Sequence, residues 1–222
     1  MKASQKGHEA LEELRIEWGA DWDGMTPLHI ALLYELEASA KLLIEWGADL
    51  SVVDRIGRTP RQIALQEGHK ALAQLLIERG ANISITDKDG MTPLHSALRQ
   101  GRMAVAQLLI EQGGELSAAA RERMTPLHIA LQYGHEDSTK LLIEWGADLS
   151  AIDWMCMTLL HTALQYGNEA SAKLLIEWGA DLSAVDWMGM TPLDIALHYR
   201  HDSSVQLLTE QGSGLSTVDL MV

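Results

Sequence analysis

The sequence predicts an all-α repeat solenoid, in which each unit of 33 residues forms a helix, a turn, a second helix and a projecting hairpin-like finger. Three recurrences with this period predict it. Threonines, usually followed by proline, stand at positions 26, 59, 92, 125, 158 and 191. Alanines stand at 31, 64, 97, 130, 163 and 196, and glycines at 47, 80, 113, 146, 179 and 212. A fixed period of this length indicates stacked units that each contact only their neighbours.

The first helix of each unit begins at the recurring threonine. Threonine is a competent N-cap, and proline suits the first helical position because its missing N–H would have no partner there. Leu127, Ala130 and Leu131 then form one apolar stripe, and the small alanine lets neighbouring helices approach closely. The helix is expected to end at a left-handed glycine, at Gly68, Gly101, Gly134 or Gly167. Glu35 and Arg200 occupy this place in two units, at a cost of about 1 kcal/mol each.

The second helix and the finger complete the unit. A helix such as residues 171–178 ends at Gly179, and an extended stretch follows over residues 180–185. Asp186 and Gly189 then mark a tight turn, since aspartate and glycine at this spacing favour one.

These motifs resemble those of the ankyrin-repeat family. The resemblance rests on Thr-Pro-Leu-His at residues 125–128, Gly-Ala-Asp at 179–181 and Asp-x-x-Gly at 186–189, all of which recur in phase from about Gly7 to Asp219. It implies a scaffold that binds a partner on a concave face formed by the finger tips and the first helices. It does not imply an activity, because a fold of this kind serves many functions.

The motif positions predict one ankyrin-repeat domain over residues 1–222. It consists of an N-terminal half repeat at 7–25, full repeats at 26–58, 59–91, 92–124, 125–157 and 158–190, and a last repeat with a truncated finger at 191–222. The link from Gly19 to Thr26 is five residues shorter than that from Gly179 to Thr191, which predicts a stunted first finger. The far end is either a partial cap or an edge at which further repeats or a second copy could add.

Composition limits the classes of partner. The net charge of -14 disfavours nucleic acid and anionic membranes. The single cysteine, Cys156, excludes an intramolecular disulfide and fits a reducing compartment. Neither a secretory signal at the N-terminus nor an apolar run of about 18 residues is visible. We therefore expect a soluble protein of the cytoplasm or nucleus whose partner is another protein and which needs no cofactor.

Carrying the concave face of the family over to this sequence gives two sets of candidate binding residues. The arginine zone consists of Arg55, Arg58, Lys88, Arg99 and Arg121. The aromatic patch consists of Met124, Gln132, Tyr133, Trp154, Met155, Met157, Gln165, Tyr166, Trp187, Met188, Met190, His198 and Tyr199.

The aromatic patch is the main indication of function. Turn tips are usually polar because they are solvated, but Trp154-Met155 and Trp187-Met188 are not. Exposed apolar patches mark interaction sites, tryptophan and tyrosine are typical interface anchors, and methionine adds an adaptable surface. The sequence therefore favours a protein-binding scaffold. The alternative for these side chains is that they pack against each other between adjacent fingers.

Two other classes of function remain open. The aromatic groove could hold a small molecule or do chemistry, with Asp194 and His198 as an acid–base pair four residues apart on one helix. A closed pocket would favour this reading and a merely curved face a protein partner. The chain could also be a purely structural segment of a larger protein. We assign no catalytic residue, and we interpret Cys156, in a finger glycine's place, as a tolerated substitution.

Three further sets of residues have a structural and a functional interpretation. The arginine zone could bind an acidic peptide or phosphate, or pair with Glu67, Glu122 and Asp89. Histidines recur at the helix starts, at His29, His95, His128 and His161. They lie a repeat apart, too far for one metal ion, and the family resemblance implies hydrogen bonds to neighbouring backbone and turn residues. Tryptophans precede the second glycine, at Trp18, Trp46, Trp145 and Trp178, which suggests stacking along the array.

Overall fold

The computed structural model describes residues 24–79 and 86–211. The chain divides into two compact units, residues 1–115 and 116–222. The boundary follows a second helix and precedes a finger, so the finger of residues 116–124 groups with the helices that come after it. The predicted half repeat, the stunted first finger and the truncated last finger lie almost wholly outside the described residues.

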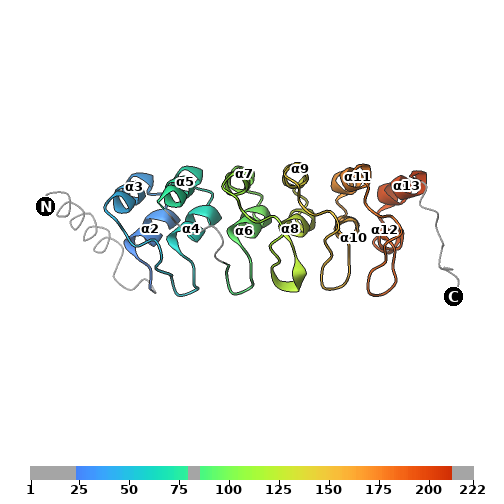
Figure 1. Ribbon diagram of the computed structural model, residues 1–222, viewed down its shortest axis with the longest axis horizontal. Helices are drawn as coiled ribbons and strands as arrows, with labels where there is room; N and C mark the ends of the chain where they lie inside the picture. Colours follow the sequence, from blue (N-terminus) through green and yellow to red (C-terminus); the bar gives the residue numbers. More distant parts are fainter. Residues whose placement is uncertain (1–23, 80–85, 212–222) are drawn as a thin grey trace. The chain divides into compact units, whose positions relative to one another are not determined.

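The described residues of the first unit form three helix pairs. Its first helices pack against one another in one row and its second helices in another, and the fingers project from the side of the first helices (Figure 1). The first helices are α2 (Pro27–Leu33), α4 (Pro60–Gln66) and α6 (Pro93–Arg99). The second helices are α3 (Glu37–Glu45), α5 (Lys70–Glu78) and α7 (Met103–Glu111).

The second unit repeats this arrangement and adds a 3-10 turn, η1 (Arg121–Arg123), in its first finger. Its first helices are α8 (Pro126–Gln132), α10 (Leu159–Gln165) and α12 (Pro192–His198). Its second helices are α9 (Glu136–Glu144), α11 (Glu169–Glu177) and α13 (Asp202–Glu210). No strand occurs among the described residues, and a single isolated bridge, between Ile152 and Thr158, marks the hairpin character of a finger. The predicted all-α repeat solenoid is confirmed.

The threonine N-caps are confirmed in all six first helices. At the start of α8, the Thr125 hydroxyl accepts a hydrogen bond from the backbone N–H of His128. In return, His128 Nδ1 accepts one from the Thr125 N–H at 3.2 Å. Gln62 and Asp194 take the histidine's part in two helices, through their side-chain oxygens. Each cap satisfies two helix N–H groups that would otherwise lack a partner.

Small and left-handed residues occupy the places that the repeat predicts. The six recurring alanines are fully buried between the helices. The first helices end at positive-φ glycines, such as Gly134 at 70°. Glu35 and Arg200 keep this left-handed geometry, at 57° and 59°, so the predicted backbone strain is present.

Candidate functional site

Two fingers of the second unit are held by buried aspartates. Asp153 Oδ1 accepts from the backbone N–H groups of Met155 and Met157, at 2.8 and 2.9 Å. Asp186 Oδ1 makes the same pair of bonds in the next finger. The aspartate carboxylate thus adds to the backbone hydrogen bond that crosses each finger, from the Asp153 N–H to the Met157 carbonyl and from the Asp186 N–H to the Met190 carbonyl, and so fixes the turn.

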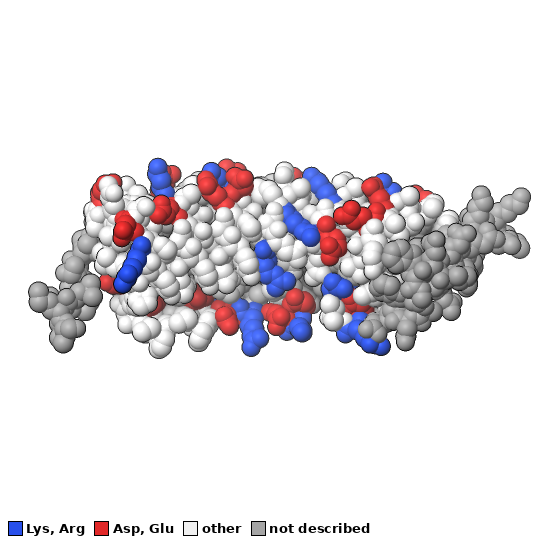
Figure 2. Space-filling view, turned by 180° about the vertical axis from the view of Figure 1, so that it is seen from behind, with Lys and Arg blue, Asp and Glu red and all other residues white. Residues whose placement is uncertain are grey.

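The tips carry Trp154 and Trp187, and a backbone hydrogen bond joins one finger to the next. The Trp187 N–H donates to the Met155 carbonyl at 3.0 Å, and the Trp154 N–H donates to the Glu122 carbonyl at 3.0 Å. The side chains remain 58 % and 62 % exposed, so packing between the fingers does not bury them. Figure 2 shows charged side chains along the lower edge at the first finger of this unit, whereas the two fingers beyond it end largely in uncharged atoms.

A second row of the patch lies at the ends of the first helices. Gln132 Nε2 donates to the Tyr166 hydroxyl at 3.1 Å, and Gln165 Nε2 donates to the Tyr199 hydroxyl at 3.2 Å. Tyr133 makes the third exposed ring of the row. This ladder could have been predicted from the sequence, because a Gln-Tyr pair recurs with the repeat period and aligns glutamine of one unit with tyrosine of the next.

The methionines of the patch differ in exposure. Met188 is exposed, whereas Met124, Met155 and Met190 are half-buried. Met157 is only 4 % exposed and does not belong to the surface. It is the last residue of its finger, directly before the N-cap Thr158 of the following helix.

Asp194 and His198 do not form an acid–base pair. Asp194 Oδ2 accepts from the backbone N–H and the hydroxyl of Thr191, at 2.8 and 2.7 Å, as part of the helix cap. The exposed His198 ring meets Tyr199 edge-on, with 5.0 Å between ring centroids. Among the described residues no hydrogen bond joins the two groups, because the cap directs the carboxylate back toward the helix start.

The recurring histidines hydrogen-bond to turn residues and backbone, as the family resemblance implied. His29 Nδ1 is 2.6 Å from the Thr26 hydroxyl, and its Nε2 donates to the Arg58 carbonyl at 3.1 Å. His161 Nε2 donates in the same way to the Met190 carbonyl. Burial lowers the pKa of all three residues His29, His128 and His161, and that of His128 to about 4. The described residues contain no group of three His, Cys, Asp or Glu side chains that could hold a metal ion.

Among the described residues, the tryptophans at the ends of the second helices make no ring contact with one another, so they do not stack as their recurrence suggested. Trp145 is 50 % exposed and Trp178 is 56 % exposed, while Trp46 is half-buried. Each is the C-cap residue of its helix. Trp18 lies outside the described residues.

The arginine zone belongs mostly to the first unit. Arg55 and Arg99 are exposed, and Arg58 is half-buried. Arg58 Nε donates to Asp54 Oδ2 at 2.8 Å, so its ion-pair partner is a residue of its own finger and not one of the carboxylates proposed from the sequence. Arg99 Nη1 donates to the Met91 sulfur at 3.6 Å.

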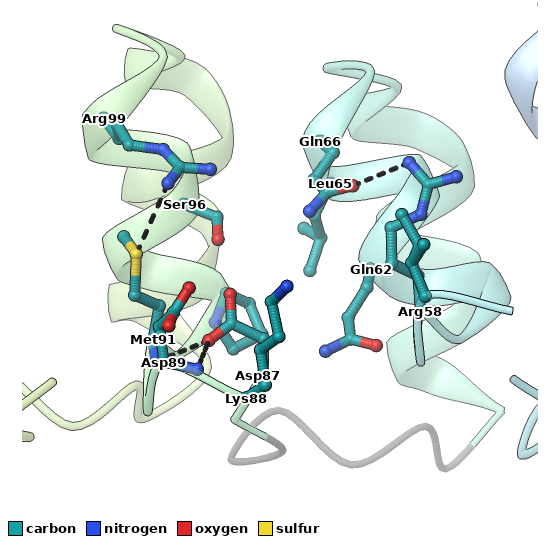
Figure 3. A pocket seen from close by; sticks show the side chains of 12 residues that line it. Arg58, Gln62, Leu65, Gln66, Asp87, Lys88, Asp89, Met91, Ser96 and Arg99 are labelled. Atoms are coloured by element: carbon teal, nitrogen blue, oxygen red, sulfur yellow. Dashed lines mark hydrogen bonds between the residues drawn. The ribbon is translucent and has the colours of Figure 1, made fainter. Parts of the chain in front are cut away.

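A cavity of about 240 Å³ lies beside these side chains (Figure 3). Arg58 and Arg99 line it together with Lys88, which comes from the intervening finger. Three members of the arginine zone thus meet at one place, which their spacing in the sequence alone does not predict.

Comparisons with known proteins agree with the repeat motifs. A family model described as ankyrin repeats (3 copies) matches residues 1–87, 62–153 and 152–219. No curated protein matches the chain in a sequence search. Within the described residues no helix is both long enough and apolar enough to cross a membrane.

Proposed function

Because the chain belongs to the ankyrin-repeat family, whose repeats generally serve as scaffolds for protein–protein interactions, we propose that it binds another protein through the aromatic patch of its second unit. One observation carries the proposal. Trp154 and Trp187 are more than half exposed on adjacent fingers whose backbones are hydrogen-bonded to each other. The turn does not require a large apolar side chain in this position, since the buried aspartates hold it and other fingers carry Arg55, Lys88 and Arg121 there.

The patch combines rigid anchors with polar groups. The indole of a tryptophan has few rotatable bonds, so its burial under a partner costs little conformational entropy. Each well-buried tryptophan of an interface contributes about 2 kcal/mol or more. The hydroxyls of Tyr166 and Tyr199 are already oriented by Gln132 and Gln165, and this preorganisation lowers the cost of binding further.

The chain offers a matched control for a test of this proposal. Trp145 and Trp178 have nearly the same exposure as the tip tryptophans but stand at the ends of second helices. Three baits are compared in a pull-down from lysate of the source cells, read by quantitative mass spectrometry. They are the unchanged protein, a Trp154→Ala/Trp187→Ala variant and a Trp145→Ala/Trp178→Ala variant, each checked for folding by circular dichroism.

A protein partner is expected with the unchanged bait and with the Trp145→Ala/Trp178→Ala bait, and it is lost with the Trp154→Ala/Trp187→Ala bait. Equal capture by all three baits would show that the finger tips are not the binding surface. Loss with the Trp145→Ala/Trp178→Ala bait alone would move the interface to the helix ends.

A further inference from the structure

The finger of residues 116–124 lacks the residue that anchors the other turns. Ala120 stands at the place where four other fingers have aspartate, at Asp54, Asp87, Asp153 and Asp186. Each of these aspartates accepts two backbone hydrogen bonds from its own finger. Because an alanine side chain has no acceptor, these two bonds cannot form in this finger.

The same finger carries backbone strain. Glu122 and Arg123 are consecutive and both left-handed, at φ of 63° and 59°. Arg123 stands at the place of the turn glycine, and no other described finger is left-handed at the place of Glu122. In this conformation the Cβ of an L-residue crowds the following carbonyl oxygen, which raises the energy of the closed turn. The hydrogen bond from the Met124 N–H to the Arg121 carbonyl is also long, at 3.4 Å.

The tip of this finger is accessible and basic. The side chains of Arg121, Glu122 and Arg123 are exposed. Within residues 24–79 and 86–211, the Arg123 side chain has no hydrogen bond or ion pair. Proteases cut folded proteins at exposed loop tips, where the chain opens locally at a low cost in free energy. A weakly anchored and strained finger with a free arginine therefore has the features of a cleavage site.

The other basic finger tips in the described residues lack these features. Arg55 and Lys88 stand at the place of Arg121 in their own fingers. Asp54 and Asp87 anchor those two fingers, and a glycine supplies the left-handed residue of each. The two fingers that carry the tip tryptophans contain neither lysine nor arginine. The structure thus singles out one finger for a protease that recognises arginine.

We propose that this finger is a processing site, at which an arginine-specific endoprotease hydrolyses the peptide bond between Arg123 and Met124. The amide N–H of this bond is the one held by the long hydrogen bond. Water adds its hydroxyl to the Arg123 carbonyl carbon and a proton to the Met124 nitrogen, so the products are a new carboxyl group and a new amino group. The cut lies close to the boundary of the two compact units, and each product keeps the described helices of one unit. The inference does not depend on the aromatic patch.

The test is limited digestion of the full chain with trypsin, which cuts after lysine and arginine, with the fragments followed over time by intact mass spectrometry. The variant Ala120→Asp/Glu122→Gly restores the anchor and removes one left-handed side chain, but it keeps both arginines. The variant Asp54→Ala makes the reverse change, because it removes the anchor from a finger that contains Arg55. Circular dichroism checks the folding of both variants.

In the unchanged protein, the first cut within residues 24–211 is expected after Arg123. The Ala120→Asp/Glu122→Gly variant is expected to be cut there about tenfold more slowly, because the rate follows the population of the open finger when opening is fast relative to cleavage. Asp54→Ala is expected to be cut faster after Arg55 than the unchanged protein. A first cut at another lysine or arginine of this range, an unchanged rate in the first variant, or no faster cut in the second would overturn the proposal.

Discussion

At the scale of single residues, Arg61 is a charge buried where the repeat otherwise has an apolar side chain. It is only 2 % exposed, and its Nε and Nη2 atoms have no hydrogen-bond partner. Five other repeats carry leucine in this place. Burial removes water from the guanidinium and lowers the pKa of Arg61 to about 10. The arginine therefore destabilises the folded state, although it stands within a regular repeat.

We predict that Arg61→Leu raises the free energy of unfolding at pH 7 by about 3 kcal/mol, since the buried charge is replaced by the side chain that fits the other repeats. Urea denaturation followed by circular dichroism measures this change. Lys70→Leu, at an exposed helix start, is the control and is expected to change stability by less than about 0.5 kcal/mol. Unchanged or reduced stability of Arg61→Leu would mean that the Arg61 guanidinium has a partner in the folded protein.

His128 links stability to pH. Its side chain is fully buried, and burial lowers its pKa from 6.5 to about 4. Between these values the unfolded chain binds a proton that the folded chain does not accept, so protonation favours unfolding. The free energy of unfolding therefore carries no penalty from His128 above pH 6.5. As the pH drops toward 4, the titration of this one residue lowers it by about 3 kcal/mol.

The variant His128→Gln tests this link, because Gln62 already closes the same helix cap in another repeat. The free energy of unfolding of the variant is expected to depend less on pH between 7 and 4 than that of the unchanged protein. Urea titrations at a series of pH values compare the two slopes. Parallel curves would show that the pKa of His128 is the same in the folded and the unfolded state.

At the scale of the structural elements, the fingers turn on a left-handed residue. Gly57, Gly90 and Gly189 supply it at φ of 83°, 74° and 79°, and Cys156 holds the same place at 57°. We predict that Cys156→Gly raises the free energy of unfolding by about 1 kcal/mol, because it removes the contact between Cβ and the backbone. Cys156→Ala keeps Cβ and is expected to give no gain. Thermal denaturation of both variants checks this. An equal rise in Tm for Cys156→Gly and Cys156→Ala would show that the gain comes from removal of the thiol and not from relief of the backbone.

Much of each helix pair could be predicted from local chemistry. Thr-Pro marks the start of a first helix, and the capping partner three residues later confirms it, even where Gln62 or Asp194 replaces histidine. The exposure of a recurring side chain could not be predicted in this way. Trp145 and Trp178 recur in phase, which is equally expected of side chains that pack on the next unit and of side chains that project from it. Met157 is buried for a similar reason, since the depth of a finger residue depends on tertiary packing.

At the scale of the whole molecule, the period of 33 residues predicts the fold, because stacked units share one set of contacts. The exposure of Trp154 and Trp187 could also be predicted, because these residues depart from the polar ones expected at turn tips. The cavity between α4 and α6 could not be, since Arg58, Lys88 and Arg99 come from three elements and meet only when two repeats stack. The partner's identity depends on the shape and charge of its own surface, which this sequence does not encode.

The central claim is that Trp154 and Trp187 anchor a protein partner. Its most direct test is isothermal titration calorimetry of the captured partner against the unchanged protein, Trp154→Ala/Trp187→Ala and Trp145→Ala/Trp178→Ala. We predict that Trp154→Ala/Trp187→Ala raises the Kd by at least about 30-fold, which corresponds to about 2 kcal/mol. The Kd of Trp145→Ala/Trp178→Ala is expected to stay within about twofold of that of the unchanged protein. Equal affinity of all three proteins, or a loss confined to the Trp145→Ala/Trp178→Ala variant, would contradict the claim.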